Sequence, residues 1–265
     1  MKKIILTTLL FISALLAKEL PTYFYSDIQD EQSVKTNLSK VGFDVIGSYN
    51  AMQNSDYKVL IYTSNILKRL SSKEDRTFAA IGKVLINKKD NILVFTNPEY
   101  FLKAFLQDDI NNALVSQVQN RLKASFDFKN SKYTIDEDDL SSYHFMISMP
   151  YYEDMLTVAN GADLNKKLLN NHKNKIIFSL KLGTNTLYGI KMDIAGGESD
   201  YIKTLNQEKH SVLLPYLVVV NNKEAKILHP KYYLAVSLPN LSMGEFMTIM
   251  DTPSNIEDYF KSLFK

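Results

Sequence analysis

Apolar residues along the chain alternate between short β-branched runs and stretches with helical spacing. Two polar turns are flanked by such runs, at residues 84–95 and 217–228, which is the pattern of a β-hairpin. Helices and hairpins together predict an α+β fold of two related two-layer α/β sandwich units with antiparallel hairpins. Helices are predicted at 30–40, 65–70, 109–123, 163–170, 198–205 and 254–264, and further strands at 43–46, 57–62, 175–182 and 187–194.

The two hairpins belong to an internal repeat. Each is followed directly by a Pro-x-Tyr-aromatic-Leu step, which begins at Pro98 in the first copy and at Pro230 in the second. Because proline has no N–H for a sheet ladder, both prolines are expected at a strand end or edge. Asn97 and His229 precede them, and a polar side chain at this position in both copies predicts a turn-forming role.

A second similarity between the halves extends the repeat. Ser-Met-Pro at 148–150 leads to Met-Leu-Thr-Val at 155–158, and Ser-Leu-Pro at 237–239 leads to Phe-Met-Thr-Ile at 246–249. Ser254 is the expected N-cap of the last helix. The polar stretch after the helix at 109–123 is expected to be loop or linker. The predicted organisation is a signal peptide at 1–17, a first α+β unit at 18–106, a helical insert and linker at 107–142, and a second α+β unit at 143–265.

The N-terminus has the pattern of a secretory signal peptide. Two lysines in residues 1–3 precede an almost wholly apolar run at 4–17. As a helix that run spans roughly 21 Å, short of the roughly 30 Å hydrocarbon core of a membrane. The pattern predicts cleavage after Ala17 and export to the periplasm. Leu15, where a small residue is usual, leaves an uncleaved anchor open, and a buried N-terminal helix is a further alternative.

Charge and cysteine content narrow the function classes. Removing residues 1–17 takes two of the 31 basic residues and leaves 29 against 29 acidic ones, so the net charge falls from +2 to about zero. This balance does not predict nucleic-acid binding. The absence of cysteine fits an exported chain and excludes thiol catalysis, iron–sulfur ligation and cysteine-based zinc sites. No stable membrane span is expected in the mature chain.

The order of elements resembles a known family. A helix leads to Gly-Phe-x-Val at 42–45, a strand at 57–62, a second helix, the hairpin and Asn97-Pro98. This order resembles the bacterial domain-of-unknown-function family numbered three-zero-two, and Leu-Pro at 214–215 is similar to that family's entry to the hairpin. The resemblance implies compact α+β units in two divergent copies and supplies no catalytic residues. In the second copy Asn-Lys-Ile-Ile at 174–177 stands where the Gly-Phe strand is expected.

No constellation in the sequence predicts a catalytic site, a metal site or a cofactor. The four histidines lack metal-ligand spacing, and His172 and His210, among Lys and Asn, are expected at the surface. The acidic residues 136–139 lack the central glycine and distal glutamate of a calcium loop, so a helix N-terminus or a solvated loop explains them better.

Aromatic and methionine side chains crowd residues 143–155 and the two Pro-x-Tyr steps. Such groups line apolar ligand pockets and interfaces, and core packing is the competing account. The candidate ligand-binding residues are Tyr100, Tyr151, Tyr152, His229 and Tyr232.

The sequence therefore predicts an exported periplasmic protein that binds a small apolar ligand or an envelope protein. Two other classes stay open. One is an envelope enzyme whose carboxylates and tyrosines converge only in three dimensions, and the other is a scaffold subunit of an envelope complex.

Overall fold

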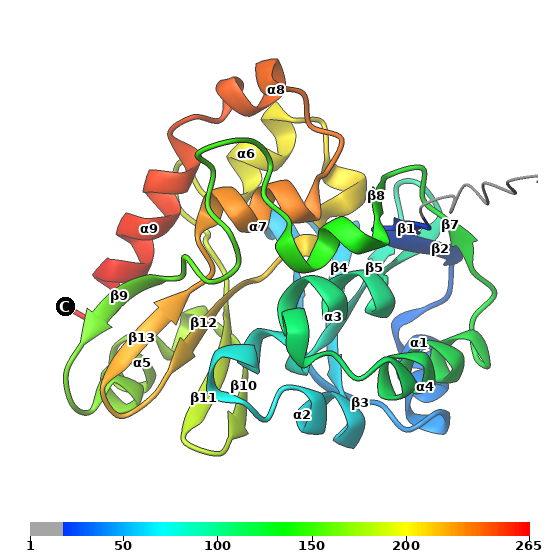
Figure 1. Ribbon diagram of the computed structural model, residues 1–265, viewed down its shortest axis with the longest axis horizontal. Coiled ribbons are helices and arrows are strands. Elements are labelled where there is room, and N and C mark those ends of the chain that lie inside the picture. Colours follow the sequence, from blue (N-terminus) through cyan, green and yellow to red (C-terminus); the bar gives the residue numbers. More distant parts are fainter. Residues whose placement is uncertain (1–17) are drawn as a thin grey trace, which may run out of the picture.

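The computed structural model describes residues 18–265 (Figure 1). The predicted signal peptide, residues 1–17, lies outside the described residues. Residues 18–265 form antiparallel sheets accompanied by helices, so the α+β class predicted from the sequence is confirmed. No helix in this part of the chain combines the length and the apolar character needed to cross a membrane.

The first sheet has six strands in the order β3-β4-β5-β6-β2-β7, and every neighbouring pair is antiparallel. Its central strands β4 and β5 are rich in branched apolar residues and buried along almost their whole length, as in sheets covered on both faces. The strands are β2 (Tyr23–Asp27), β3 (Asp44–Asn50), β4 (Tyr57–Thr63), β5 (Gly82–Asn87), β6 (Ile92–Thr96) and β7 (Lys129–Asn130).

The second sheet has five antiparallel strands in the order β10-β11-β12-β13-β9. Here β11 and β12 are the fully buried strands. A separate pair joins β1 (Glu19–Pro21) to β8 (Thr134–Asp136). The strands of the second sheet are β9 (Leu156–Asn160), β10 (Ile176–Leu182), β11 (Asn185–Ile190), β12 (Tyr216–Val220) and β13 (Glu224–Ile227).

The two sheets are built from the same order of elements. Apart from β7, the strands β3-β4-β5-β6-β2 correspond one for one to β10-β11-β12-β13-β9. Helix α1 (Glu31–Lys40) joins β2 to β3 as α5 (Leu164–His172) joins β9 to β10, and α3 (Pro98–Leu106) follows β6 as α7 (Pro230–Ser237) follows β13. Positions 98 and 230 are 132 residues apart, as are the first residues of β3 and β10, 44 and 176. We call β2 to α3 the first unit and β9 to α7 the second unit.

Both repeat prolines lie just beyond a strand end and begin a helix. Pro98 opens α3 and Pro230 opens α7, where the missing N–H is not needed for an intrahelical bond. The side chains of Asn97 and His229 cap these helices, each accepting from the backbone N–H two residues on, at 3.0 Å and 3.2 Å. The turn-forming role predicted for both residues is therefore confirmed, as helix capping.

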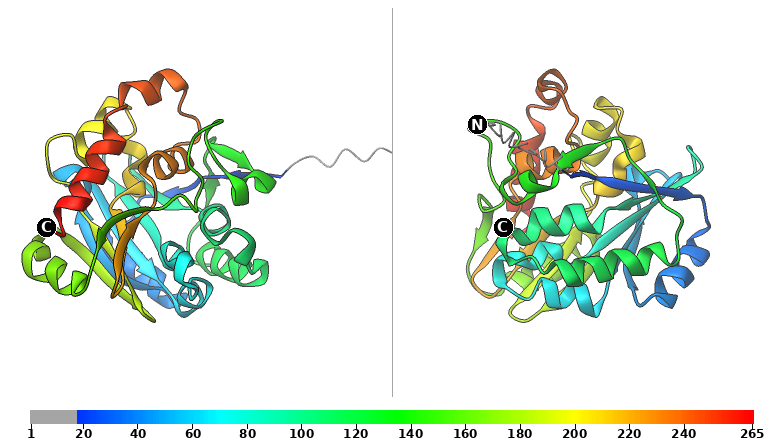
Figure 2. Two further views of the ribbon diagram at one scale, coloured as in Figure 1. Left: turned by 60° about the vertical axis from the view of Figure 1, so that its left-hand side comes forward. Right: turned by 45° about the vertical axis from the view of Figure 1, so that its right-hand side comes forward.

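Each unit places one short 3₁₀ segment on the sheet of the other. Segment η2 (Glu74–Ala80) of the first unit contacts β11 and β12, and η6 (Glu208–Leu213) of the second unit contacts β4, β5 and β6. The edge strands β3 and β10 also meet, and a Cβ at Gly47 would lie 2.9 Å from the Ile177 carbonyl oxygen. The two sheets therefore share one hydrophobic core, with helices around them (Figure 2).

The helices α3 and α7 exchange equivalent hydrogen bonds. The Tyr100 hydroxyl donates to the Val236 carbonyl at 2.8 Å, and the Tyr232 hydroxyl donates to the Ala104 carbonyl at 3.1 Å. Tyr100 and Tyr232 are 132 positions apart, and so are Ala104 and Val236. This reciprocal contact is the signature of a two-fold interface, here between two units of one chain. We call it the tyrosine seam.

The second similarity seen in the sequence is not structural. Residues 156–160 form strand β9, which pairs with β13, whereas residues 243–248 form helix α8. A capping box between Ser242 and Glu245 starts this helix, which the comparison of short motifs did not take into account. The predicted equivalence of 155–158 and 246–249 is therefore wrong.

Other expectations are corrected in detail. The polar stretch expected as loop contains β7 and β8, because Phe128 packs against Phe24 and Phe95, at 5.0 Å between ring centroids in both cases, and holds β7 against β2. Helix α9 begins earlier than predicted, with Asp251 and not Ser254 at its N-cap. The remaining helices are α2 (Asn65–Leu70), α4 (Asn112–Lys123), α6 (Glu198–Thr204), α8 (Met243–Thr248) and α9 (Thr252–Ser262).

Candidate functional site

Three of the predicted ligand-binding residues meet at the tyrosine seam. The rings of Tyr152 and Tyr232 are 6.0 Å apart and edge to face, and Tyr100 is buried beside them through the α3–α7 contact. The Tyr152 hydroxyl donates to the Asp75 carbonyl at 2.6 Å, so all three hydroxyls have backbone partners. The seam joins the two units, and the ligand-binding role of these residues stays a prediction.

The other two predicted residues lie in more open surroundings. Tyr151 is 42% exposed and stands against His144, with ring centroids 4.4 Å apart. His229 is half-buried at the start of α7, where burial lowers the pKa of its imidazole. Its Nδ1 accepts a backbone N–H in the helix cap, so that this nitrogen already has a partner.

A cleft of about 240 Å³ opens where η6 meets β2. Its lining combines aromatic and leucine side chains with polar and charged ones. We call it the His210 cleft, because His210 is the residue around which its rings are arranged. It is lined by Tyr23, Lys132, Tyr133, Gln207, His210, Ser237, Leu238, Asn240, Leu241 and Glu245.

His210 is buried, with only 3% of its surface exposed, so the predicted surface position is wrong. The imidazole stacks on Tyr23 at 5.1 Å between ring centroids and meets Tyr133 edge-on at 4.8 Å. Its Nε2 lies 2.8 Å from the Tyr25 hydroxyl oxygen, and its Nδ1 lies 2.7 Å from Oε1 of Gln207. The polar sequence around His210 gave no sign of burial, because its partners come from β2 and from the insert.

These contacts settle the form of the imidazole. Oε1 of Gln207 can only accept, so Nδ1 of His210 carries the proton and Nε2 accepts from the Tyr25 hydroxyl. Burial, helped by Lys209 and Lys132 and opposed by Asp90, lowers the pKa of His210 to about 4. His210 is therefore neutral at pH 7, with both nitrogens engaged.

The surroundings of His210 carry a positive electrostatic bias. Lys209 lies over the Tyr25 ring, 4.5 Å from its centroid, and Lys132 lies 5.7 Å from the centroid of Tyr133. Glu245 also lines the cleft, but its carboxylate accepts from the Ser242 backbone N–H at 2.8 Å and from the Ser242 hydroxyl at 2.7 Å. The two lysines lie against the rings, whereas Glu245 keeps its negative charge but holds it on the carboxylate that accepts from Ser242.

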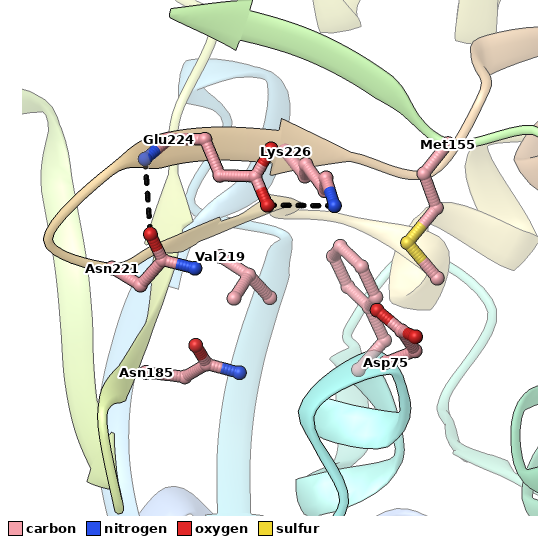
Figure 3. A pocket seen from close by; sticks show the side chains of 8 residues that line it. Asp75, Met155, Asn185, Val219, Asn221, Glu224 and Lys226 are labelled. Atoms are coloured by element: carbon pink, nitrogen blue, oxygen red, sulfur yellow. Dashed lines mark hydrogen bonds and ion pairs between the residues drawn. The ribbon is translucent and has the colours of Figure 1, made fainter. Parts of the chain in front are cut away.

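The repeat gives the cleft a counterpart in the second unit. There η2 meets the start of β9, and Met155 stands 132 positions after Tyr23. This counterpart is a slot of only about 10 Å³, room for one water at most. Figure 3 shows its wall on β13, where Glu224 and Lys226 form an ion pair at 2.7 Å. We call it the Met155 slot; its lining is Asp75, Phe78, Met155, Asn185, Val219, Asn221, Glu224 and Lys226.

Two buried ionisable groups tie the units together near the cleft. Lys83 of β5 donates to the carbonyls of Leu213 and Pro215, at 2.5 Å and 2.9 Å, and to the Tyr233 hydroxyl oxygen at 2.9 Å. Burial lowers the pKa of Lys83 to about 7, and in its protonated form all three N–H groups are donated. Lys83 therefore has no N–H left for a ligand.

Glu198 at the start of α6 is the second of these groups. Its carboxylate accepts from the Tyr49 hydroxyl at 3.0 Å, and burial raises its pKa to about 7. Neither Lys83 nor Glu198 carries a motif, so sequence reasoning missed both. A charged residue inside the apolar run of β5 was the one available signal.

Among the acidic residues 136–139, Glu137 takes part in a local ion-pair network. These residues begin a 3₁₀ turn, in which Glu137 pairs with Lys103 at 3.0 Å and with Lys18 at 3.2 Å. These pairs lower the pKa of Glu137.

The chain was compared with protein-family models, with curated proteins and with solved structures, and none of the three comparisons found a match.

Proposed function

We propose that the protein is an exported, non-catalytic binding protein that holds a small molecule in the His210 cleft. The ligand is a compound with a flat or apolar ring and one anionic group. The observation that carries the proposal is the cleft of about 240 Å³ between the units, with stacked rings in its lining and two lysines beside them.

The apolar part of the cleft lining explains why the proposed ligand contains a ring. Tyr133 is half-buried and presents its ring to the cleft, backed by the buried stack of Tyr23 and His210, and Leu238 and Leu241 also line it. Aromatic faces of this kind bind flat groups by offset or edge-to-face stacking, with a gain beyond the apolar area buried. A cleft that combines such a lining with a few polar groups is the usual form of a small-molecule site.

The lysines near the cleft explain why the proposed ligand carries an anionic group. Lys132 lines the cleft and Lys209 lies over the neighbouring Tyr25, while the carboxylate of Glu245 is held by Ser242. His210 is neutral at pH 7 and contributes no charge to the site. The preference for an anion therefore comes from Lys132 and Lys209. A carboxylate near Lys132 gains a charge-assisted hydrogen bond while its ring lies against the aromatic lining.

Binding is favoured over catalysis because the perturbed groups are already engaged. Both nitrogens of His210 and all three N–H groups of protonated Lys83 have protein partners. An envelope enzyme is the second candidate, since the Tyr25 hydroxyl donates to His210 as a nucleophile donates to its base. Burial raises the pKa of Tyr25, however, which keeps this hydroxyl protonated and unsuited to attack.

Export and domain ancestry are parts of the same proposal. The apolar run at 4–17 supports export, and the shared order of strands supports two copies of one ancestral unit similar to family three-zero-two. An exported pair of units with a site at their junction fits a periplasmic binding protein, in which the junction creates a cleft that neither unit has alone.

Native mass spectrometry of the protein purified from its own cells tests the proposal. We expect a reproducible mass excess that disappears on denaturation, and its loss in Asn240→Trp, because an indole at this exposed cleft residue fills the space. Asn222→Trp, at the exposed turn of the second hairpin, is the matched control and should keep the excess. A bare mass in the wild type, or an excess that survives Asn240→Trp, would contradict the proposal.

A further inference from the structure

A group of methionines stands exposed at one corner of the molecule. Figure 1 shows α8 at the top, away from both sheets. Met243 and Met247 of this helix are 42% and 53% exposed, and Met250 in the turn that follows is 62% exposed. Large apolar side chains are usually buried, so three neighbouring exposed methionines call for a ligand or a partner. We call these three residues the methionine face.

The spacing places the three side chains together. Met243 and Met247, four residues apart, lie on one face of α8, and unbranched methionine side chains reach neighbours one turn away. The helix ends at Thr248, and Met250 follows in a turn in which the backbone N–H of Ile249 donates to the Phe246 carbonyl at 3.2 Å and that of Met250 donates to the Met247 carbonyl at 3.4 Å, so Met250 stays next to Met247.

The turn that carries the methionine face is anchored from below. Phe246 is buried and stacks on Phe145 at 5.3 Å between ring centroids. The capping box of Ser242 and Glu245 fixes the start of α8. The three thioethers are therefore presented by a turn held at its start and at its buried side.

Thioether sulfur is a soft ligand that selects Cu(I) over harder cations. The sequence contains nine methionines and no cysteine, so its soft ligands are all thioethers. Leucine would serve an apolar docking surface equally well, whereas sulfur at all three positions is what a soft cation requires. We propose that the methionine face binds one Cu(I) ion through the sulfurs of Met243, Met247 and Met250.

This inference is independent of the His210 cleft, and leucine substitution separates it from apolar docking. In Met243→Leu/Met247→Leu/Met250→Leu the side chains keep their apolar character and similar volume but lose sulfur. A protein partner held by apolar contact would still bind this variant, whereas Cu(I) would not. Met155→Leu, in the slot on η2 and β9, is the matched control.

Anaerobic titration of the full chain with Cu(I), buffered by a chromophoric Cu(I) chelator, tests the proposal. We expect one equivalent bound, at least tenfold weaker binding in the triple leucine variant (about 1.4 kcal/mol or more), and no change in Met155→Leu. Circular dichroism of each variant checks that it is folded. X-ray absorption of the copper complex should show sulfur ligands. Failure of the wild type to take Cu(I) from the chelator, or equal binding by the folded triple variant, would overturn the proposal.

Discussion

The His210 cleft and the Met155 slot occupy related places in the two units, and only one of them is open. Each is lined by residues of a 3₁₀ segment of one unit and by a residue at the start of, or just before, the first strand of the other. At the slot the counterpart of Tyr23 is Met155, and about 10 Å³ remains. At the cleft the insert adds Lys132 and Tyr133, the stretch after α7 adds Asn240, and about 240 Å³ remains open. The space for a ligand therefore lies where the two units differ.

The tyrosine seam and the contacts of Lys83 show the opposite case. Where the units are equivalent, Tyr100 and Tyr232 exchange matching hydrogen bonds and leave no space between α3 and α7. Lys83 is not matched, because its counterpart strand β12, Tyr-Leu-Val-Val-Val, contains no lysine. Lys83 nevertheless links the two units beside η6 through its hydrogen bonds to Leu213 and Pro215. Packing thus accounts for the symmetric contacts, and the cleft needs a separate explanation.

The largest effect is expected from Lys83→Met. This change leaves the buried carbonyls of Leu213 and Pro215 without their donor, so the free energy of unfolding in urea at pH 7 should fall by about 2–4 kcal/mol. The control Lys58→Met breaks only a surface pair with Glu31 and should change it by about 0.5 kcal/mol or less. Equal stability of Lys83→Met and the wild type would show that Lys83 does not hold the junction closed.

The pH dependence of the same pair of proteins sharpens the test. The pKa of Lys83 is about 7 in the folded protein, against 10.5 for an ordinary lysine side chain. Between these values the unfolded chain binds more protons than the folded one, so this residue makes stability rise with pH. Wild type should therefore gain stability relative to Lys83→Met from pH 7 to pH 10, and parallel curves would contradict the assignment.

The cleft side of the junction should respond to acid through His210. The pKa of His210 is about 4 in the folded protein, against 6.5 for an ordinary histidine, so its contribution to stability is present above pH 6.5 and is lost as the pH falls through 4. The free energy of unfolding lost through His210 on acidification is about 3 kcal/mol at most. Urea unfolding at pH 7 and pH 4.5 should show a smaller acid loss in His210→Gln than in the wild type, and an equal loss in both would remove His210 from the account.

Equivalent substitutions in the tyrosine seam test the symmetry. Tyr100→Phe and Tyr232→Phe each remove one buried hydrogen bond to a helix-end carbonyl, which should lower the free energy of unfolding by about 1–2 kcal/mol. Because the two contacts are related by the repeat, their effects should agree within about 0.5 kcal/mol. Tyr151→Phe, on a 42% exposed ring, should have almost no effect. Clearly unequal losses of unfolding free energy in the two variants would contradict the equivalence of the two units.

The smallest effect is expected at the Met155 slot. Met155 is half-buried, so Met155→Ala should lower the free energy of unfolding by about 1 kcal/mol or less. The enlarged slot lacks the stacked rings of the cleft, and its Lys226 is paired with Glu224, so native mass spectrometry should show the same bound mass as in the wild type. A second equivalent of ligand in this variant would mean that volume alone decides binding.

Much of the fold could be predicted because local signals and tertiary structure agree. Helix α2 at 65–70 and the hairpin strands around residues 84–95 were predicted nearly at their observed bounds. Helices α3 and α7 were not predicted. In α7 all residues but Lys231 are buried, so amphipathic spacing is lost, whereas α3 keeps a polar side with Glu99 and Lys103 and its helical period was overlooked.

The candidate site was largely hidden from sequence reasoning. His210 sits between polar neighbours, and its burial depends on Tyr23, Tyr25 and Tyr133, which are far away in the sequence. The aromatic residues that did stand out, such as Tyr100 and Tyr232, are joined in the seam. Composition shows which rings are present, but only the docking of two units decides which of them face a cavity.

The central claim is that the His210 cleft binds small ring-containing anions and the Met155 slot does not. It is tested most directly by an NMR titration of the isotope-labelled protein with phenylacetate at pH 7. The account predicts saturable shifts in the signals of His210, Tyr133 and Leu241, and none at Met155. Saturable shifts at Met155 with none at His210, or no saturable shift anywhere, would contradict it.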